Sequence, residues 1–527
     1  MPDGRPSTKS LLRPPTQAWG WAWGREQRRV TCLVAKYLER EEALIVRENE
    51  CSQKLPDLHG TSSDELRKIH AAGLDILAEV GVQVEEQELR QRLRVLGAQV
   101  RARDEIVCLP KDLTLAALRS APAHYTLHDR RGGSFVIGDG SYHVAAPGHV
   151  PNVLDYGISV PRLPEQKDLQ AFTTLLDALP DIDLVRAAVV PVSPAGWERS
   201  LCTMVDLVSR TAKHTLVVPF DFQEFRLWVD LSSRLARPAR LDERRIISAF
   251  VSTTSPLRIT SDDSLILQLC CRERIPICIL SSVSVGGTGP VTLAGALAVQ
   301  HAENLFVAAV SQLLSPGIPV CYGTTSSPLD MRSARTSRGG PMHSLLVRAS
   351  PGLARLCGLP CYCGSFHTDA SAPDFQAGTQ KASMLVSALT SGASVCGGPG
   401  VLQAAMLASL EQVVLDMELY RAFRRLQRGF GVNDERLSVP TVAAVGPGGN
   451  FLAEEHTVRW MRDEDESFNP GLFASAAWPA DGRTMLDRAH EQVENILRTH
   501  QPGVTLAELE IIEEFAREVR NGGGAIV

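Results

Sequence analysis

The chain has 527 residues, of which 44% are hydrophobic and 22% are charged, a composition typical of a globular protein that buries a sizeable core. A formal net charge of -6 argues against a nucleic-acid partner, because phosphate binding requires a concentrated basic surface. No apolar run reaches the roughly 18 residues that a membrane span needs, so we expect no membrane association.

The first 55 residues differ in composition from the rest. They are rich in arginine and contain the run Trp19–Gly24, but show no clear signal peptide. We expect a disordered extension, an upstream start that is not used, or, less favoured, an aromatic docking segment. The 12 cysteines are too sparse for a disulfide framework, and several lie inside apolar runs. Buried free thiols in a cytoplasmic protein are the expected state.

A helical lead-in is predicted for residues 56–135. Ser62 or Ser63 can cap a helix whose apolar residues recur at helical spacing until Gly81. Two further helices are expected at about 85–96 and 111–120.

Short β-rich runs alternate with longer helical runs over residues 136–430. The strand candidates are 142–146, 184–190, 215–219, 246–252, 277–282, 318–323, 360–364 and 393–396. Most are apolar throughout, which is typical of parallel strands covered on both faces. Eight strands, each followed by a helix, predict an α/β fold of the (β/α)8 TIM-barrel type. A doubly wound open sheet is the main alternative, but no Gly-x-Gly-x-x-Gly motif follows an early strand.

Small residues recur where these strands end. Examples are Ser193-Pro194, Ser252–Thr254, Gly286–Gly289, Gly323–Thr325 and Gly397–Gly400. In a barrel, strand ends form one mouth where active sites lie, although small residues also make tight turns without any ligand. Beyond residue 430 the alternation stops, and we expect residues 431–527 to form an extension that packs on the barrel.

Several segments, in order, resemble the trimethylamine methyltransferase family between about residues 62 and 498. They are IHAAGLDILAEVGVQV, APGHVPNVLD, DALPDID, GPVTLAGALAVQHAE, LEQVVLD and VGPGGNFLAEEHT. The family includes corrinoid-dependent amine methyltransferases and relatives without pyrrolysine that demethylate quaternary amines such as glycine betaine. The resemblance implies a methylated amine bound in the mouth and a separate corrinoid (cobalamin) protein docking over it, with no tightly bound cofactor in this chain. A homo-oligomer is left open.

The chain departs from the family pattern at several positions. Met342 stands where a glutamate is common, Asn450 where a histidine is common, and Tyr156–Ile158 replaces a Thr-Gly-Glu turn. The position of pyrrolysine matches His367, so the chain resembles the branch that lacks pyrrolysine. A quaternary ammonium leaves as a neutral amine without a general acid, so we expect a quaternary substrate rather than a tertiary one.

Quaternary ammonium groups usually bind to aromatic faces. Candidates near strand ends are Tyr142, Trp197, Phe220, Tyr322, Tyr362 and Phe366. Tyr322 and Phe366 are preferred because each lies close to a glycine at a strand end, although core packing is the usual role of such aromatics.

A carboxylate on the substrate could be held by a histidine, with His367 preferred over His143 and His149. Asp330 and Asp369, in loops after two strands, could orient a histidine or face the cationic nitrogen. Helix capping is an equal alternative for both. His367, Asp369 and Asp330 are thus the predicted catalytic residues.

Two carboxylates of the LEQVVLD segment, Glu411 and Asp416, are expected to form structural salt bridges. The cysteines Cys357, Cys361 and Cys363 form C-x3-C-x-C, but a structural zinc site normally needs four ligands, so we predict no metal. Two alternatives to the methyltransferase remain: a zinc-dependent corrinoid methyltransferase, and a non-catalytic barrel that binds a methylated amine or a corrinoid protein.

Overall fold

The computed structural model describes residues 61–101, 103–236, 245–461, 463, 472 and 482–524. The segment 1–55, which we expected to be an extension, lies outside the described residues.

Eight parallel strands close into a barrel in the order β11-β13-β16-β17-β6-β7-β8-β9. In chain order these are β6 (His143–Ala145), β7 (Leu184–Val185), β8 (His214–Val217), β9 (Ile247–Ser252), β11 (Ile277–Leu280), β13 (Val320–Thr324), β16 (Cys361–Gly364) and β17 (Val395–Gly397). Each strand pairs with the next along the chain, and β17 pairs with β6 to close the ring. The predicted (β/α)8 barrel is confirmed, with one barrel strand overlapping each of the eight predicted ranges.

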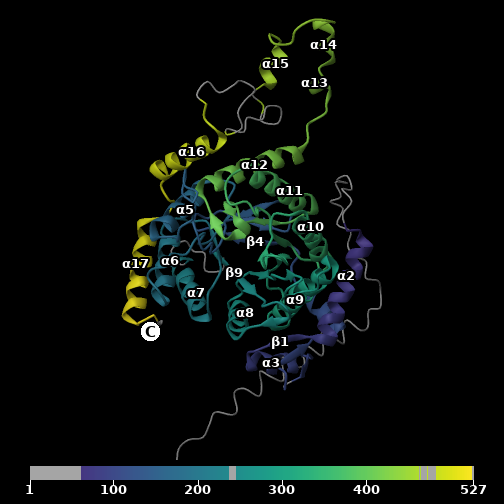
Figure 1. Cartoon of the computed structure of the whole chain (residues 1–527), viewed down its shortest axis with the longest axis vertical. Coiled ribbons are helices and arrows are strands. Elements are labelled where there is room, and N and C mark those ends of the chain that lie inside the picture. Colours follow the sequence, from purple (N-terminus) through teal and green to yellow (C-terminus); the bar gives the residue numbers. More distant parts are fainter. Residues whose placement is uncertain are drawn as a thin grey trace, which may run out of the picture.

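One helix follows each barrel strand and covers the outside of the ring (Figure 1). The helices are α5 (Gln166–Ala178), α6 (Trp197–Val208), α7 (Phe222–Ala236), α8 (Ser261–Glu273), α9 (Leu293–Leu314), α10 (Pro341–Leu356), α11 (Phe375–Ser391) and α12 (Leu410–Arg428). Of the described helices, α9 alone is long and apolar enough to cross a membrane, but most of its apolar stretch is buried inside the protein. Its Glu303 carboxylate accepts hydrogen bonds from the hydroxyls of Thr253 and Ser281, as befits a core helix.

The barrel lumen is packed with side chains rather than open. Its buried cluster contains one or more residues from each barrel strand, among them Leu216, Phe250 and Tyr362. The hairpin of β4 (Tyr125–His128) and β5 (Ser134–Ile137) adds two apolar side chains to this cluster. The same hairpin bonds to residues that begin β6 and β8, so it closes the amino-terminal end of the barrel. The carboxyl ends of the strands are left as the face for a functional site.

The region before the barrel is mixed rather than purely helical. It holds α2 (Ser63–Asp75), α3 (Gln87–Val95) and α4 (Lys111–Leu118), where helices were expected. Between them run β1 (Val82–Val84), β2 (Gln99–Arg101) and β3 (Ile106–Cys108), which join β10 (Arg258–Ile259) in a four-stranded sheet. Strands of two or three residues are too short to show an alternation of apolar and polar residues. In addition, β1 pairs with β10, which lies far along the chain in the loop after β9, so the sequence pattern did not reveal this sheet.

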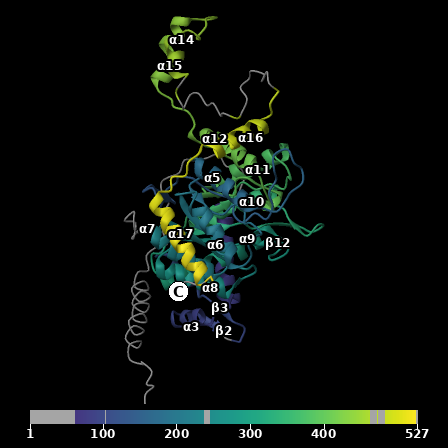
Figure 2. The same cartoon turned by 90° about the vertical axis from the view of Figure 1, so that its left-hand side faces the viewer.

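The carboxyl-terminal region behaves in two ways. Helices α16 (Met485–Thr499) and α17 (Leu506–Asn521) run along the outside of the barrel against α5, α6 and α7. In contrast, α13 (Asp434–Leu437), α14 (Val439–Val445) and α15 (Glu455–Trp460) project away from the barrel (Figure 2). The expectation that the whole extension packs on the barrel therefore holds for α16 and α17 but not for α13–α15.

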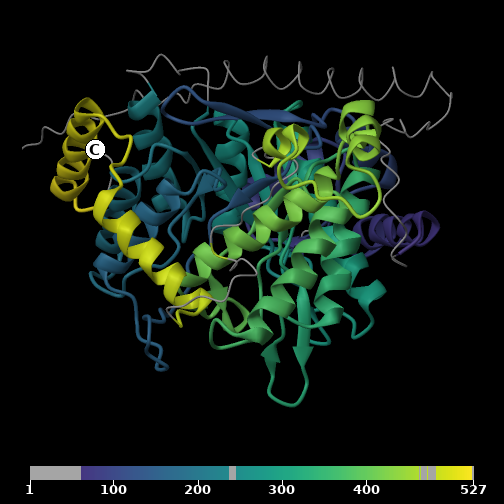
Figure 3. The same ribbon diagram turned by 90° about the horizontal axis from the view of Figure 1, so that it is seen from above.

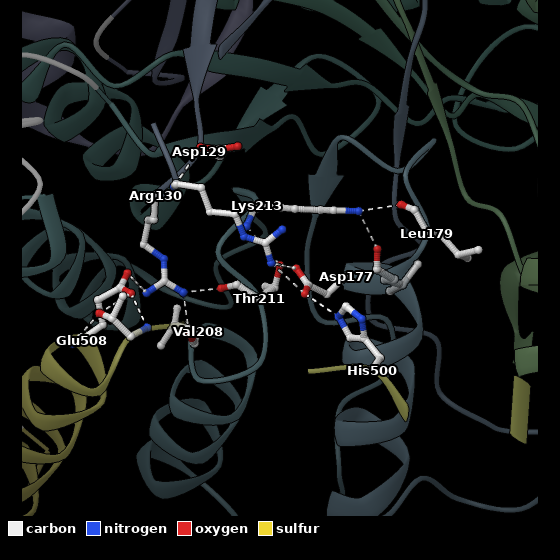
Figure 4. Close-up of polar contacts among 12 residues, drawn as sticks. Asp129, Arg130, Asp177, Leu179, Val208, Thr211, Lys213, His500 and Glu508 are labelled. Atoms are coloured by element: carbon white, nitrogen blue, oxygen red, sulfur yellow. Dashed lines mark hydrogen bonds and ion pairs between the residues drawn. The ribbon is translucent and has the colours of Figure 1, made fainter. Parts of the chain in front are cut away.

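Buried ionic contacts attach the last two helices to the barrel (Figure 4). The Asp177 carboxylate accepts hydrogen bonds from Thr211 Oγ1 at 2.7 Å and from His500 Nε2 at 2.8 Å. Nearby, Arg130 pairs with Glu508 of α17 at 2.8 Å. Because these groups are largely shielded from solvent, their loss would leave unpaired charges, and the contacts fix the extension in place.

A second projection leaves the barrel in a different direction from the α13–α15 segment (Figure 2). Strands β12 (Ser284–Val285), β14 (Ser327–Asp330) and β15 (Arg335–Thr336) form a small sheet, and the β14–β15 hairpin extends from the body (Figure 3). This sheet is inserted between barrel strands and their helices, at the carboxyl ends of β11 and β13, so it lies beside the mouth.

Candidate active site

Five basic side chains gather where the barrel strands end, and we call them the mouth cluster: His149, Arg186, Arg338, His343 and His367. His149 comes after β6, Arg186 directly follows β7, and His367 comes after β16. Arg338 lies just before α10, and His343 is in the first turn of that helix. The charges of Arg186 and Arg338 both act on the His367 imidazole, and the charge of Arg186 also acts on His149, so the five side chains share one electrostatic environment.

Two glycines position the His367 ring. A β-carbon on Gly364, the last residue of β16, would lie 2.4 Å from His367 Cε1. A β-carbon on Gly398, just after β17, would lie 3.3 Å from Nε2. The ring therefore rests directly on the ends of two strands, and its centroid is 5.8 Å from that of His343. The pattern of glycines at strand ends thus serves a side chain, not only a turn.

Arg186 occupies the top of the lumen. Its Nε donates to the Ala146 carbonyl at 2.7 Å, and a terminal nitrogen donates to the Tyr362 hydroxyl at 2.9 Å. The guanidinium carbon lies 5.1 Å from the centre of the Phe250 ring, within the range of a cation–π contact. The aromatic faces of the upper lumen thus already hold a cation that belongs to the protein.

Two buried nitrogens of the mouth cluster, Nε of Arg338 and Nδ1 of His367, have no hydrogen-bond partner within the described residues. The ring of His343 interacts with the Arg338 backbone. Buried polar atoms are normally paired with protein groups, water or a ligand, so unpaired nitrogens at the strand ends mark a candidate binding position. Because the arginine nitrogen is a donor, a ligand bound there must offer an acceptor.

Burial keeps the histidines of the mouth cluster neutral. Desolvation, with a smaller effect of a neighbouring arginine, lowers the pKa of His149 and that of His343 to about 3. The same causes hold the pKa of His367 well below its ordinary value. Arginine remains charged at neutral pH even when it is buried, so Arg186 and Arg338 supply the positive charge of the cluster.

The nearby carboxylate of Asp369 does not balance both arginines. It accepts a hydrogen bond from the Arg338 backbone N–H at 2.7 Å and another from the Ser337 hydroxyl at 2.7 Å. Asp369 therefore organises the loop before α10, next to the mouth cluster. The charge of Asp369 acts on Arg338, whereas the contacts of Arg186 are with neutral acceptors. The cluster therefore carries an excess of positive charge, and the arrangement is suited to binding an anionic group.

The other predicted site residues lie in different places. The Tyr322 hydroxyl contacts Gln300 and His301 of α9, between the strands and the helices, and Phe366 lies in the same outer layer. Tyr142 and His143 are at the amino-terminal end of the barrel, where Tyr142 donates to the Leu389 carbonyl. The structure does not bring these four residues together at the mouth.

Two further aromatics and one aspartate have separate positions. Phe220, 52% exposed after β8, stacks on His149 with ring centroids 4.5 Å apart and lies at the rim of the mouth. Trp197 begins α6 and packs against Gly524, beyond α17. Asp330 is exposed in the β14–β15 turn, where it accepts hydrogen bonds from Arg332 and Ser333.

One carboxylate of the LEQVVLD segment forms a buried ion pair and the other a hydrogen bond. Asp416 pairs with Lys381 of α11 at 2.6 Å, and both side chains are almost completely buried. Glu411 is hydrogen-bonded to His490 Nδ1 of α16 at 2.8 Å. Lys381 also donates to the Phe366 carbonyl, one residue before His367, so the buried ion pair supports the loop that carries the predicted catalytic histidine.

The C-x3-C-x-C cysteines lie away from the lumen. Cys361 and Cys363 pack in the outer layer with their sulfur atoms 3.7 Å apart, whereas Tyr362 between them packs in the lumen. All the described cysteines are free thiols. These two thiols cannot reach a substrate in the barrel mouth.

Sequence reasoning missed Arg186, Arg338 and His343. A usable signal existed for Arg186, because it is the single charged residue in the predicted strand 184–190. Arg338 and His343 flank the Gly339–Met342 departure, and nothing in the sequence shows that they lie close to His367 in the fold.

Comparison with known proteins identifies the family. Residues 28–523 match the family model described as trimethylamine methyltransferase. The chain is 29% identical over 470 residues to a trimethylamine methyltransferase of Methanosarcina barkeri, covering 87% of this chain and 94% of the relative. It is 28% identical over 457 residues to a glycine betaine methyltransferase of Desulfitobacterium hafniense, covering 85% and 94%.

A solved monomethylamine methyltransferase of Methanosarcina barkeri aligns over 96% of this chain and 94% of its own, at 13% identity and a TM-score of 0.48. The family match spans the lead-in, the whole barrel and the carboxyl-terminal helices. The chain belongs to the trimethylamine methyltransferase family.

Proposed function

We propose that this protein transfers a methyl group from a quaternary amine bearing a carboxylate, such as a betaine, to the cobalt of a corrinoid carried by a separate protein. Membership of the family supports methyl transfer from an amine. The observation that carries the choice of substrate is the mouth cluster, with two buried arginines and unpaired donor nitrogens.

Charge decides between substrate classes. A methylated amine that carries only positive charge would enter a site in which Arg186 and Arg338 already place two positive charges. Like charges in a poorly solvated site repel, and burial strengthens the effect. A carboxylate can accept hydrogen bonds from Arg338 and interact favourably with both guanidinium groups. A zwitterion therefore fits where a simple cation does not.

The low pKa values of the mouth histidines also favour a quaternary amine over a tertiary one. A tertiary amine is a poor methyl donor unless it is protonated or otherwise activated. The histidines of the mouth cluster are unsuited to this, since burial lowers the pKa of His343 to about 3 and leaves it without a proton to donate at neutral pH. A quaternary ammonium needs no proton, because it leaves as a neutral amine. Such a substrate needs only positioning and the exclusion of water.

The corrinoid would supply the nucleophile that accepts the methyl group. The residues of this chain would bind the carboxylate and hold the methyl group toward the open face. Phe220, exposed at the rim and stacked on His149, offers an apolar surface for the docking partner. The described cysteines of this chain are free thiols, and most are buried, which suits a reducing compartment. We therefore propose a cytoplasmic location for the protein.

The test is methyl transfer to reduced cobalamin from four donors: glycine betaine, choline, tetramethylammonium and trimethylamine. Formation of methylcobalamin is followed by absorbance. We expect activity with glycine betaine and little with the three donors that lack a carboxylate. Activity with trimethylamine or tetramethylammonium equal to that with glycine betaine would refute the proposed substrate class.

A non-catalytic barrel is the second candidate, motivated by the family departures at Met342 and Asn450. Asn450 lies between α14 and α15, which project away from the barrel (Figure 1), and its side chain accepts from the Leu452 N–H. Its change therefore does not alter the mouth. Binding of glycine betaine without methyl transfer under any condition would favour this second candidate.

A further inference from the structure

Two histidines and a cysteine meet on the outside of the barrel. His70 is in α2, His301 is in α9, and Cys357 is the residue that ends α10. One ligand atom from each lies within 4.8 Å of the others. The three helices pack against one another beside the barrel (Figure 1), and this position is distinct from the mouth cluster.

The three ligand atoms, within 4.8 Å of one another, would have to shift to reach the spacing of a metal centre. Zinc binds imidazole nitrogen at about 2.0–2.1 Å and thiolate sulfur at about 2.3 Å, so ligand atoms in a tetrahedral site are about 3.3–3.6 Å apart. His70 Nδ1 and His301 Nε2 are 2.8 Å apart. Widening this pair by about half an ångström would let both nitrogens bind one ion.

The surroundings orient His301 for this role. Its Nδ1 lies 3.3 Å from the Tyr322 hydroxyl, which also accepts a hydrogen bond from Gln300 Nε2 at 3.2 Å. Metal-binding histidines commonly hold their second nitrogen in such a contact, which fixes the ring and its tautomer. Gly73, one turn after His70, makes room for the ring: a β-carbon there would lie 2.7 Å from His301 Cδ2.

The protonation states also suit a metal ion. In the absence of an ion the facing nitrogens of His70 and His301 share one hydrogen bond, and a metal ion would replace its proton. The Cys357 thiol has its pKa raised to about 12 by burial, and an ion must displace its proton on binding. One thiolate with two neutral imidazoles is a donor set preferred by zinc(II) and copper(I) over hard cations.

We propose that His70, His301 and Cys357 bind one thiophilic transition-metal ion, zinc(II) or copper(I), which ties α2 to α9 and α10. The site lies outside the barrel and does not depend on the proposed methyl transfer. Its three protein ligands leave the fourth position of a tetrahedral zinc ion to water, whereas copper(I) needs no fourth ligand. The sequence analysis predicted no metal at the C-x3-C-x-C cysteines, and the proposed site uses one of them, Cys357, with two histidines from distant parts of the chain.

The test uses the full-length protein, stripped with a chelator and then supplied separately with zinc(II), copper(I) or cobalt(II). Bound metal is counted by mass spectrometry after gel filtration. We expect one equivalent of zinc or copper, a raised melting temperature, and a cobalt(II) spectrum with thiolate charge-transfer bands. Cys357→Ser should abolish those bands, and His70→Gln, at a half-buried position, should weaken binding by at least about tenfold.

Two controls separate this site from other metal binding. Cys202→Ser changes a partly buried thiol of α6 outside the cluster and should leave stoichiometry, spectrum and melting temperature unchanged. The double variant His70→Gln/Cys357→Ser, checked for folding by circular dichroism, measures metal bound elsewhere. Binding by copper(I) alone would identify a monovalent ion at the same site. Wild-type binding that does not exceed that of the double variant would overturn the proposal.

Discussion

The buried ion pair between Lys381 and Asp416 allows a sharp test of how the mouth loop is supported. The Asp416 carboxylate accepts from Lys381 Nζ at 2.6 Å, from the Gly400 N–H at 2.6 Å and from Gln412 Nε2 at 2.7 Å. Lys381→Met removes its positively charged partner and leaves a buried carboxylate with two neutral donors. Breaking a buried pair in this way costs about 3–5 kcal/mol, so we expect a loss of that size in the free energy of unfolding.

The assay is urea unfolding followed by circular dichroism at pH 7. Adding Asp416→Asn to Lys381→Met removes the unpaired charge, so the double variant should be more stable than the single one by at least about 1 kcal/mol. Lys167→Met is the matched control, because Lys167 forms a salt bridge with Glu165 at an exposed site and should show no measurable change. A loss below about 1 kcal/mol for Lys381→Met, or strictly additive effects, would refute the reasoning.

Three further predictions concern the mouth and the carboxyl-terminal helices. Gly364→Ala should displace the His367 ring and lower kcat/KM by about tenfold or more, with an unchanged circular dichroism spectrum; full activity would show that the ring position is unimportant. His149 and His343, each with a pKa of about 3, stay neutral in the fold, whereas the unfolded chain binds protons below about pH 6.5. The free energy of unfolding should therefore fall as the pH decreases from 6.5 toward 3, and each histidine should account for about 2 kcal/mol of the loss at pH 5. His343→Gln should flatten this dependence of stability on pH; a variant curve parallel to that of the wild type would contradict the reasoning. Asp177→Asn should cost about 1–3 kcal/mol in urea unfolding, and an unchanged midpoint would show that this contact does not hold the extension.

The barrel could be predicted from the sequence because its signal is local. Each strand is a short apolar run between turn residues, and each is followed by a helix, so no long-range information is needed. The small sheet of β1, β2, β3 and β10 could not be predicted in the same way. Its strands are two or three residues long and depend on pairing between the lead-in and a loop of the barrel.

The candidate site was predicted only in part because the direction of a side chain depends on strand register. Tyr322 and Tyr362 both lie in barrel strands, yet Tyr322 faces α9 and Tyr362 faces the lumen. A strand of four or five apolar residues gives no indication of which face is inward. Arg186 and Arg338 are 152 positions apart in the sequence and both act on His367 only in the closed barrel. The positive charge of the mouth could therefore not be predicted from the sequence.

The most direct test of the account is a calorimetric comparison of glycine betaine and choline, which share a trimethylammonium group and differ in whether a carboxylate is present. If the mouth cluster selects an anionic arm, glycine betaine binds at least about tenfold more tightly than choline. Arg338→Met then removes most of that preference while leaving the fold intact. Equal affinity for the two ligands, or a preference unchanged in Arg338→Met, would contradict the account.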